Sequence, residues 1–238
     1  MEGRNQGLGI RGSGFESLIA LGFLVAFGMP CFAQDILEIS PEPKLQITLR
    51  VYDYAQVSPR TLGHAEEEAS RILRTAGVEM AWVDCPTSVE VAANYPACEP
   101  PLGAMAVDLR ILPPSMAARL QSGREQLGFA LPSTKAGSAS AAWIFRHRVE
   151  QLADSKDADQ AQILGHAMAH EIGHLLLGPN RHSDRGIMRA NWDRKTLQEA
   201  GRGQLLFTSI QAELIRAGVQ ARINIQETRD NTQLAGAH

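Results

Sequence analysis

The alternation of hydrophobic and polar residues predicts several β-strands in this chain. In residues 45–51, Leu, Ile, Leu and Val alternate with Gln, Thr and Arg, which is the period of a half-buried strand. The same alternation recurs in residues 105–111, and the apolar stretches at 78–84 and 139–145 predict two further strands. Gly128–Leu131 is a short extended segment followed by a proline, and we expect it to be an edge strand.

Helical spacing of hydrophobic residues occurs between and after these strands. Ser58 and Pro59 form a helix start, with a capping hydroxyl before a proline in the first turn, and Gly77 ends that helix. Residues Asp157–Leu177 show the clearest helical pattern, with an apolar stripe on one face. Another helix is expected around Thr208–Ala217.

This order of elements predicts the fold class. One strand and a helix come first, then three strands that include the edge strand, a further strand, the long helix, irregular chain and a last helix. Such an order is typical of an α+β fold with α/β-like layers, in which a mixed sheet packs on helices. We expect a single domain over residues 34–225 and a disordered tail over 226–238, because the tail is polar.

Residues 1–33 have the pattern of a secretory leader. Arg4 and Arg11 precede Leu18–Phe27, which holds only apolar residues and glycine, and small residues at Cys31 and Ala33 favour cleavage after Ala33. The alternative is a retained anchor, but the apolar run is shorter than the roughly 20 residues that a membrane-spanning helix needs. We therefore expect an exported protein, secreted or periplasmic, with no stable membrane insertion once the leader is removed.

Charge and cysteine content narrow the function classes. The formal net charge is −3 and the sequence pI is about 6.2, so a nucleic-acid partner is not expected. Two of the three cysteines, Cys85 and Cys98, follow the predicted leader. In an exported protein such a pair predicts a disulfide that closes a surface loop, whereas a reducing compartment would leave two free thiols. We expect a monomer.

The sequence His170-Glu171-Ile172-Gly173-His174 carries the candidate chemistry. Two imidazoles four residues apart on a helix share one face and can bind one metal ion. Zinc lowers the pKa of a bound water to about 7, and the adjacent Glu171 carboxylate can then accept its proton. A glycine and a proline follow the helix, so the chain can turn back and offer a third ligand.

This segment resembles the metzincin clan of zinc peptidases, most closely its matrixin or archaemetzincin type. The clan pattern is H-E-x-x-H-x-x-G-x-x-H followed by a methionine turn. Here Gly178 is one residue late and His182 is two residues late, while Met188 follows His174 by fourteen residues, as in matrixins. Ser183 after His182 also matches the matrixin His-Ser pair.

Because His182 departs from the clan spacing, several residues are candidates for the third metal ligand. His182 is the expected ligand, because imidazole binds zinc well and a longer loop changes the closure entropy little. Asn180 occupies the strict clan position, and Asp184 would supply a carboxylate. Glu199, from a following helix, would give a thermolysin-like arrangement.

The resemblance implies a zinc-dependent endopeptidase. It implies that Glu171 serves as general base and then general acid, and that Met188 lies under the metal as packing. It also implies that an extended protein or peptide substrate pairs with the edge strand near Gly128–Leu131, and that the C-terminal helix forms a lower subdomain. The alternatives are a catalytically idle zinc-binding or peptide-binding protein on the same scaffold, and a structural protein with a buried histidine helix.

The remaining histidines carry less information. His166 lies one turn before His170 and could assist the metal, but helix packing or the cleft rim is the more ordinary role for it. His64, His147 and His238 match no pattern and are expected at the surface.

Overall fold

The computed structural model describes residues 44–99, 103–120, 126–131, 140–178 and 181–235. The chain divides into residues 1–41 and 42–238, and all described residues belong to the second unit. The predicted leader and its cleavage point lie outside the described residues. Within the described ranges, no helix is long and apolar enough to span a membrane.

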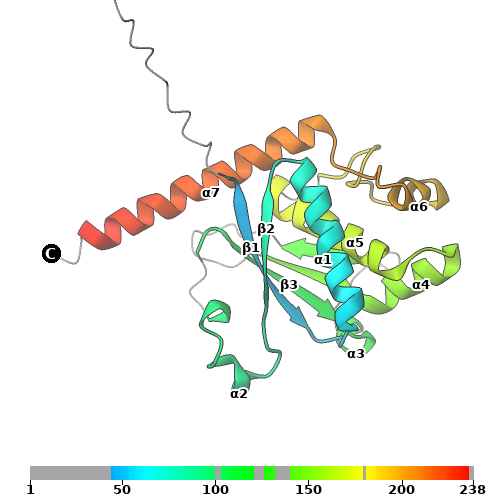
Figure 1. Ribbon diagram of the computed structural model, residues 1–238, viewed down its shortest axis with the longest axis horizontal. Coiled ribbons are helices and arrows are strands. Elements are labelled where there is room, and N and C mark those ends of the chain that lie inside the picture. Colours follow the sequence, from blue (N-terminus) through cyan, green and yellow to red (C-terminus); the bar gives the residue numbers. More distant parts are fainter. Residues whose placement is uncertain (1–43, 100–102, 121–125, 132–139, 179–180, 236–238) are drawn as a thin grey trace, which may run out of the picture. The chain divides into compact units, whose positions relative to one another are not determined.

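A mixed five-stranded sheet forms the centre of this unit (Figure 1), which confirms the α+β fold class. Its strands are β1 (Gln46–Asp53), β2 (Glu79–Asp84), β3 (Ala106–Leu112), β4 (Gly128–Leu131) and β5 (Ser140–Phe145), in the order β2-β1-β3-β5-β4. Neighbouring strands are parallel except β4, which pairs antiparallel with β5. The prediction that residues 128–131 form an edge strand is therefore confirmed.

The five longer helices each contribute residues to one hydrophobic core with the sheet. The longer helices are α1 (Pro59–Thr75), α4 (Arg146–Lys156), α5 (Gln160–Leu177), α6 (Arg194–Gly201) and α7 (Ser209–Ala235); the short ones are α2 (Val89–Ala92), η1 (Pro96–Cys98) and α3 (Pro114–Ala117). Helix α5 lies against α1, β4 and β5, and it also contacts α4, α6 and α7 (Figure 1). Its apolar stripe is fully buried, so this helix is rigidly held by its neighbours.

The helix predicted over Asp157–Leu177 begins later than expected. Asp157 has a left-handed backbone (φ 53°) and ends α4, and the side chain of Asp159 accepts a hydrogen bond from the Gln162 amide at the start of α5. Residues 146–156 form α4, which the hydrophobic pattern did not predict. Few residues of α4 are buried, so its periodicity is weak.

The prediction of a disordered tail over 226–238 is wrong for residues 226–235. Helix α7 continues to Ala235, far beyond the expected end at Ala217. Polar side chains one turn apart support this part of the helix, including Gln226 Nε2 donating to Asp230 Oδ1. Gln226 Oε1 also accepts the Ala104 amide at 2.9 Å, which ties the helix to the loop before β3. Residues 236–238 lie outside the described residues.

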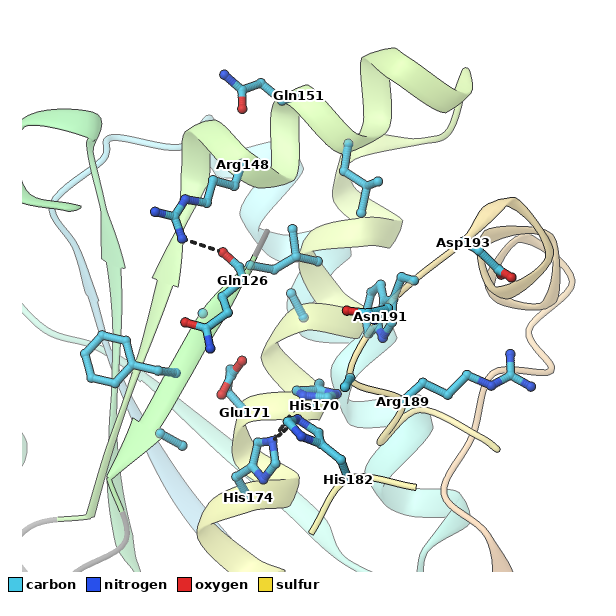
Figure 2. A pocket seen from close by; sticks show the side chains of 18 of the residues that line it. Gln126, Arg148, Gln151, His170, Glu171, His174, His182, Arg189, Asn191 and Asp193 are labelled. Carbon is cyan, nitrogen blue, oxygen red and sulfur yellow. Dashed lines mark hydrogen bonds between the residues drawn. The ribbon is translucent and has the colours of Figure 1, made fainter. Parts of the chain in front are cut away.

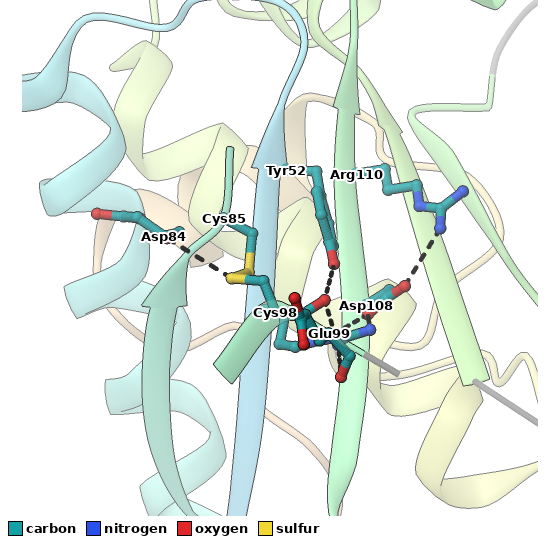
Figure 3. Close-up of a disulfide and its surroundings, with 8 residues drawn as sticks. Tyr52, Asp84, Cys85, Cys98, Glu99, Asp108 and Arg110 are labelled. Atoms are coloured by element: carbon teal, nitrogen blue, oxygen red, sulfur yellow. Dashed lines mark hydrogen bonds and ion pairs between the residues drawn. A yellow bond between two sulfur atoms is a disulfide. The ribbon is translucent and has the colours of Figure 1, made fainter. Parts of the chain in front are cut away.

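The predicted disulfide between Cys85 and Cys98 is present (Figure 3). The loop that it closes is held to the sheet by the buried Arg50, which donates to the Cys98 carbonyl and to Asp108 Oδ1, both at 2.9 Å. Tyr52 adds a 3.3 Å hydrogen bond from its hydroxyl to the same carbonyl. Because strand residues alternate between faces, Arg50 projects away from the core face that Leu49 and Val51 occupy.

Candidate metal centre

Three imidazoles meet beside the C-terminal half of α5 (Figure 2). His170 and His174 lie one turn apart on the helix, and His182 comes from the chain that follows it. The Nε2 atom of His174 is 3.1 Å from His170 Nε2 and 3.1 Å from His182 Nε2. Two nitrogens bound to a tetrahedral zinc ion at ~2.05 Å would be about 3.3 Å apart. Two of the three separations are thus close to that value, and all three donor atoms lie within 4.8 Å of one another, so the cluster could hold a metal ion.

A backbone carbonyl orients the first histidine. His170 Nδ1 lies 2.7 Å from the carbonyl oxygen of Ile187, and because a carbonyl only accepts, the ring donates from Nδ1. The neutral ring then carries its lone pair on Nε2, the atom that faces the other two histidines. A hydrogen bond of this kind selects the tautomer and fixes the ring plane of a metal-binding histidine.

Burial keeps the two helix histidines uncharged. Desolvation lowers the pKa of His170 to about 4, and desolvation together with the neighbouring His170 and His182 lowers the pKa of His174 to about 3. Near pH 7 both rings are neutral and their nitrogens can act as donors to a metal ion. His182 is exposed, so this side of the cluster opens to solvent.

Glu171 lies beside the cluster, and its carboxyl group is buried. It follows His170 directly on α5, is 5% exposed and lines the same cleft (Figure 2). Desolvation raises the pKa of this carboxyl to about 8. Its Oε2 atom has no hydrogen-bond partner among the described residues. This oxygen is buried and unpaired, on a side chain that lines the cleft.

A glycine on the edge strand makes room for this carboxyl. A Cβ atom at Gly128 would lie 2.9 Å from Glu171 Cγ and 3.0 Å from Glu171 Oε1, and it would also clash with the Trp143 carbonyl oxygen. Any side chain at position 128 would thus push Glu171 or the strand aside. Sequence patterns marked residues 128–131 as an edge strand but did not reveal this contact.

Met188 is fully buried against α5. Its Sδ atom would lie 2.7 Å from a Cβ atom at Gly173, the residue that precedes His174. The methionine thus packs closely on the helix turn that carries the histidines. Ser183 donates its amide hydrogen to the Met188 carbonyl at 2.9 Å, so residues 183–188 form a closed turn that returns to the helix.

The other ligand candidates differ in position. Among the described residues, the cluster of possible metal ligands consists of His170, His174 and His182. It contains neither Asp184 nor Glu199. Asp184 is exposed, and Glu199 forms an ion pair with Arg189 at 2.9 Å. Asn180 lies outside the described residues.

The other described histidines are not part of the cluster. His166 is fully buried: its Nδ1 is 2.8 Å from the Gln162 carbonyl, and its Nε2 is 3.5 Å from Glu68 of α1, so it serves helix packing. His64 is exposed and His147 is partly buried. His238 lies outside the described residues.

The cluster lies in a cleft of about 850 Å³. Residues of β4 line one side of it, α5 forms the floor, and α4 and the segment 189–193 complete the walls (Figure 2). Arg148 of α4 donates to the Gln126 carbonyl at 2.8 Å, which joins that helix to the chain before β4. The Trp192 ring meets the His170 ring edge-on at 5.9 Å. Neither Arg148 nor Trp192 carries a sequence signal, because only the packing of separate segments places them here.

No known family model matches this chain, and a search of curated proteins finds no significant match. The resemblance to metzincins therefore depends on the motif and on the spacing from His174 to Met188.

Proposed function

We propose that this protein is an exported, zinc-dependent endopeptidase of metzincin type. The observation that carries the proposal is the convergence of three imidazole Nε2 atoms next to a buried carboxyl group, in a cleft bordered by β4, the edge strand of the described sheet. His170, His174 and His182 would hold the metal. Zinc bound there would supply Lewis-acid polarisation of a peptide carbonyl and a lowered pKa for water.

Glu171 would do the proton transfer. It lies next to His170 on α5 and borders the cleft. A cation held by the histidines would favour the ionised form of this buried carboxyl, so that the carboxylate could take a proton from the attacking water and deliver it to the leaving amine nitrogen. The space opposite Gly128 gives this carboxyl room beside the strand. A peptide bond cleaved at this position would lie between Glu171 and the histidine cluster.

The edge of β4 would hold the substrate. Among the described strands β4 pairs only with β5, and Gly128, Phe129 and Ala130 line the cleft. An extended peptide can add to such an edge through backbone hydrogen bonds and present its carbonyl to the site. This mode accepts many sequences, because the backbone supplies most of the contacts.

Export is the part of the proposal that the disulfide supports. Disulfides persist in oxidising compartments, and the Cys85–Cys98 bond forms part of the folded unit. Together with the leader pattern in residues 1–33, this favours a secreted or periplasmic protein.

The test compares Glu171→Gln with the wild-type protein, and Glu67→Gln on the exposed face of α1 serves as the matched control. Wild type and the control should bind one zinc per chain and cleave an unstructured protein such as casein, and a zinc chelator should stop the cleavage. Glu171→Gln should keep zinc and lose at least ~100-fold in kcat/KM, the scale of general acid–base catalysis. Zinc bound without any hydrolysis by wild type would favour the catalytically idle alternative.

A further inference from the structure

The start of α7 is built around a reciprocal pair of hydrogen bonds. The Thr208 amide donates to Gln211 Oε1 at 2.9 Å, and the Gln211 amide donates to Thr208 Oγ1 at 3.3 Å. This is a capping box, in which the residue before the helix and the third residue of its first turn satisfy each other's backbone groups. Gln211 is 8% exposed, so its remaining amide group needs a partner inside the protein.

That partner lies in the segment that carries His182. Gln211 Nε2 donates to Ser183 Oγ at 3.0 Å, and Ser183 Oγ donates in turn to the Arg185 carbonyl at 2.7 Å. The direction of both bonds follows from chemistry: the Thr208 amide requires the oxygen of Gln211, and the Arg185 carbonyl requires the hydroxyl hydrogen of Ser183. A side chain at the start of α7 is therefore bonded to the residue next to His182.

Further bonds extend this connection to the first histidine. The Ile187 amide donates to the Leu206 carbonyl at 2.9 Å, and the Ile187 carbonyl accepts from His170 Nδ1 at 2.7 Å. Two residues thus hold the turn 183–188: Gln211, in the first turn of α7, holds Ser183, and Leu206, before α7, holds Ile187. One of these points adjoins His182 and the other orients His170.

We propose that Gln211 is a positioning residue for His182, so that the capping box of α7 also sets the third ligand of the metal centre. This inference rests on the proposed function, because it assumes that the three histidines bind a metal. His182 is exposed and comes from a chain segment with an unusual spacing, so packing alone does not hold its ring. The bond from Gln211 to Ser183 holds the backbone beside it. Loss of a partner bonded directly to a ligand weakens metal binding by about 10- to 100-fold, and because Gln211 acts through the residue next to the ligand we expect the lower end of that range.

The experiment measures zinc affinity by competition with a chromogenic chelator in full-length protein. Gln211→Leu removes both the capping bond to the Thr208 amide and the bond to Ser183. Ser183→Ala removes the bond to Gln211 and leaves the capping box intact. The double variant tests whether the two act through one interaction. Gln220→Leu, at an exposed position on the same helix, is the matched control. Cobalt replacement adds a spectroscopic readout, since the visible absorption of Co²⁺ changes with the number of bound imidazoles.

We expect Ser183→Ala and Gln211→Leu each to weaken zinc binding by about 10-fold or more. The double variant should bind zinc with the same affinity as the more weakly binding single variant. The zinc affinity of Gln220→Leu should match that of wild type. Ser183→Ala should keep the wild-type Tm of the metal-free protein, which separates positioning from folding and keeps the test decisive if Gln211→Leu fails to fold. Zinc affinity within threefold of wild type in Ser183→Ala would overturn the positioning role alone. A wild-type protein that binds no zinc would instead overturn the proposed function.

Discussion

Gly128 and Glu171 lie so close together that a single methyl group at position 128 would touch the glutamate side chain, 2.9 Å from its Cγ atom. The two residues come from the edge strand and from the helix that carries the histidines. The contact therefore fixes the distance between the strand where a substrate would pair and the carboxyl group that would transfer the proton.

Gly128→Ala should separate metal binding from catalysis. The added methyl group displaces Glu171 while the three histidines stay in place, so zinc should remain bound and kcat/KM should fall by about 10-fold or more. Overpacking should also lower the free energy of unfolding by about 1–3 kcal/mol. Gly63→Ala is the control, since nothing lies within 4 Å of a Cβ atom there and the change should stabilise α1 slightly. Full activity in Gly128→Ala would show that the position of Glu171 is unimportant.

Removal of His182 should weaken zinc binding by more than ~100-fold, because a direct ligand matters more than the outer partner of one. Asp184→Ala should keep wild-type affinity, since Asp184 is exposed and outside the cluster. Asn180→Ala tests in the same way whether the residue at the strict clan position binds zinc. Zinc content after dialysis, with a competition titration, checks all three. Stoichiometric zinc in His182→Ala would assign the third ligand to another residue.

Stability should fall as the pH rises through neutrality, because of Glu66 on α1. Burial, and then the negative charge of Asp84, raises the pKa of Glu66 to about 7 from an ordinary 4.5. The folded state therefore binds this proton more tightly than the unfolded state. The resulting stability is complete below about pH 4.5 and is lost as the pH rises through 7.

Glu66→Gln should remove the part of this dependence that Glu66 causes, leaving that of the buried Glu171, and should stabilise the protein at pH 8. The shift corresponds to at most ~3 kcal/mol, and partial exposure of the group reduces the expected gain to about 1–2 kcal/mol. Urea unfolding at pH 5 and pH 8 provides the measurement, with the exposed neighbour Glu67→Gln as the control. Equal pH dependence in wild type and Glu66→Gln would contradict the assignment.

Loss of the disulfide should lower stability and leave the metal centre intact. The Cys85→Ala, Cys98→Ala double variant frees a loop whose closure contributes about 3 kcal/mol through the entropy of the unfolded chain. Arg50 and Asp108, which hold this loop, do not line the cleft. Zinc affinity should therefore match wild type while the urea midpoint falls. A parallel loss of zinc would reveal a link between the loop and the site.

Elements whose residues repeat regularly could be predicted from the amino-acid pattern. Alternating side chains in 45–51 and 105–111 predicted strands, and the four-residue spacing of His170 and His174 put both rings on one face of a helix. The two cysteines predicted the disulfide, and the proline after Leu131 predicted an edge strand. Each of these features depends on residues close together in the chain, where local geometry decides the outcome. The polar residues 226–235 were mispredicted because polar i,i+4 pairs can sustain a helix without an apolar face.

Contacts between distant residues depend on how the segments pack in three dimensions. His182, Asp184 and Glu199 were all acceptable ligands by residue type, and the turn that returns to α5 brings only the histidine to the cluster. The space that Gly128 leaves for Glu171 and the bond from Gln211 to Ser183 join separate segments as well. No periodicity records such contacts, because they depend on how the edge strand, α5 and the start of α7 pack around one core.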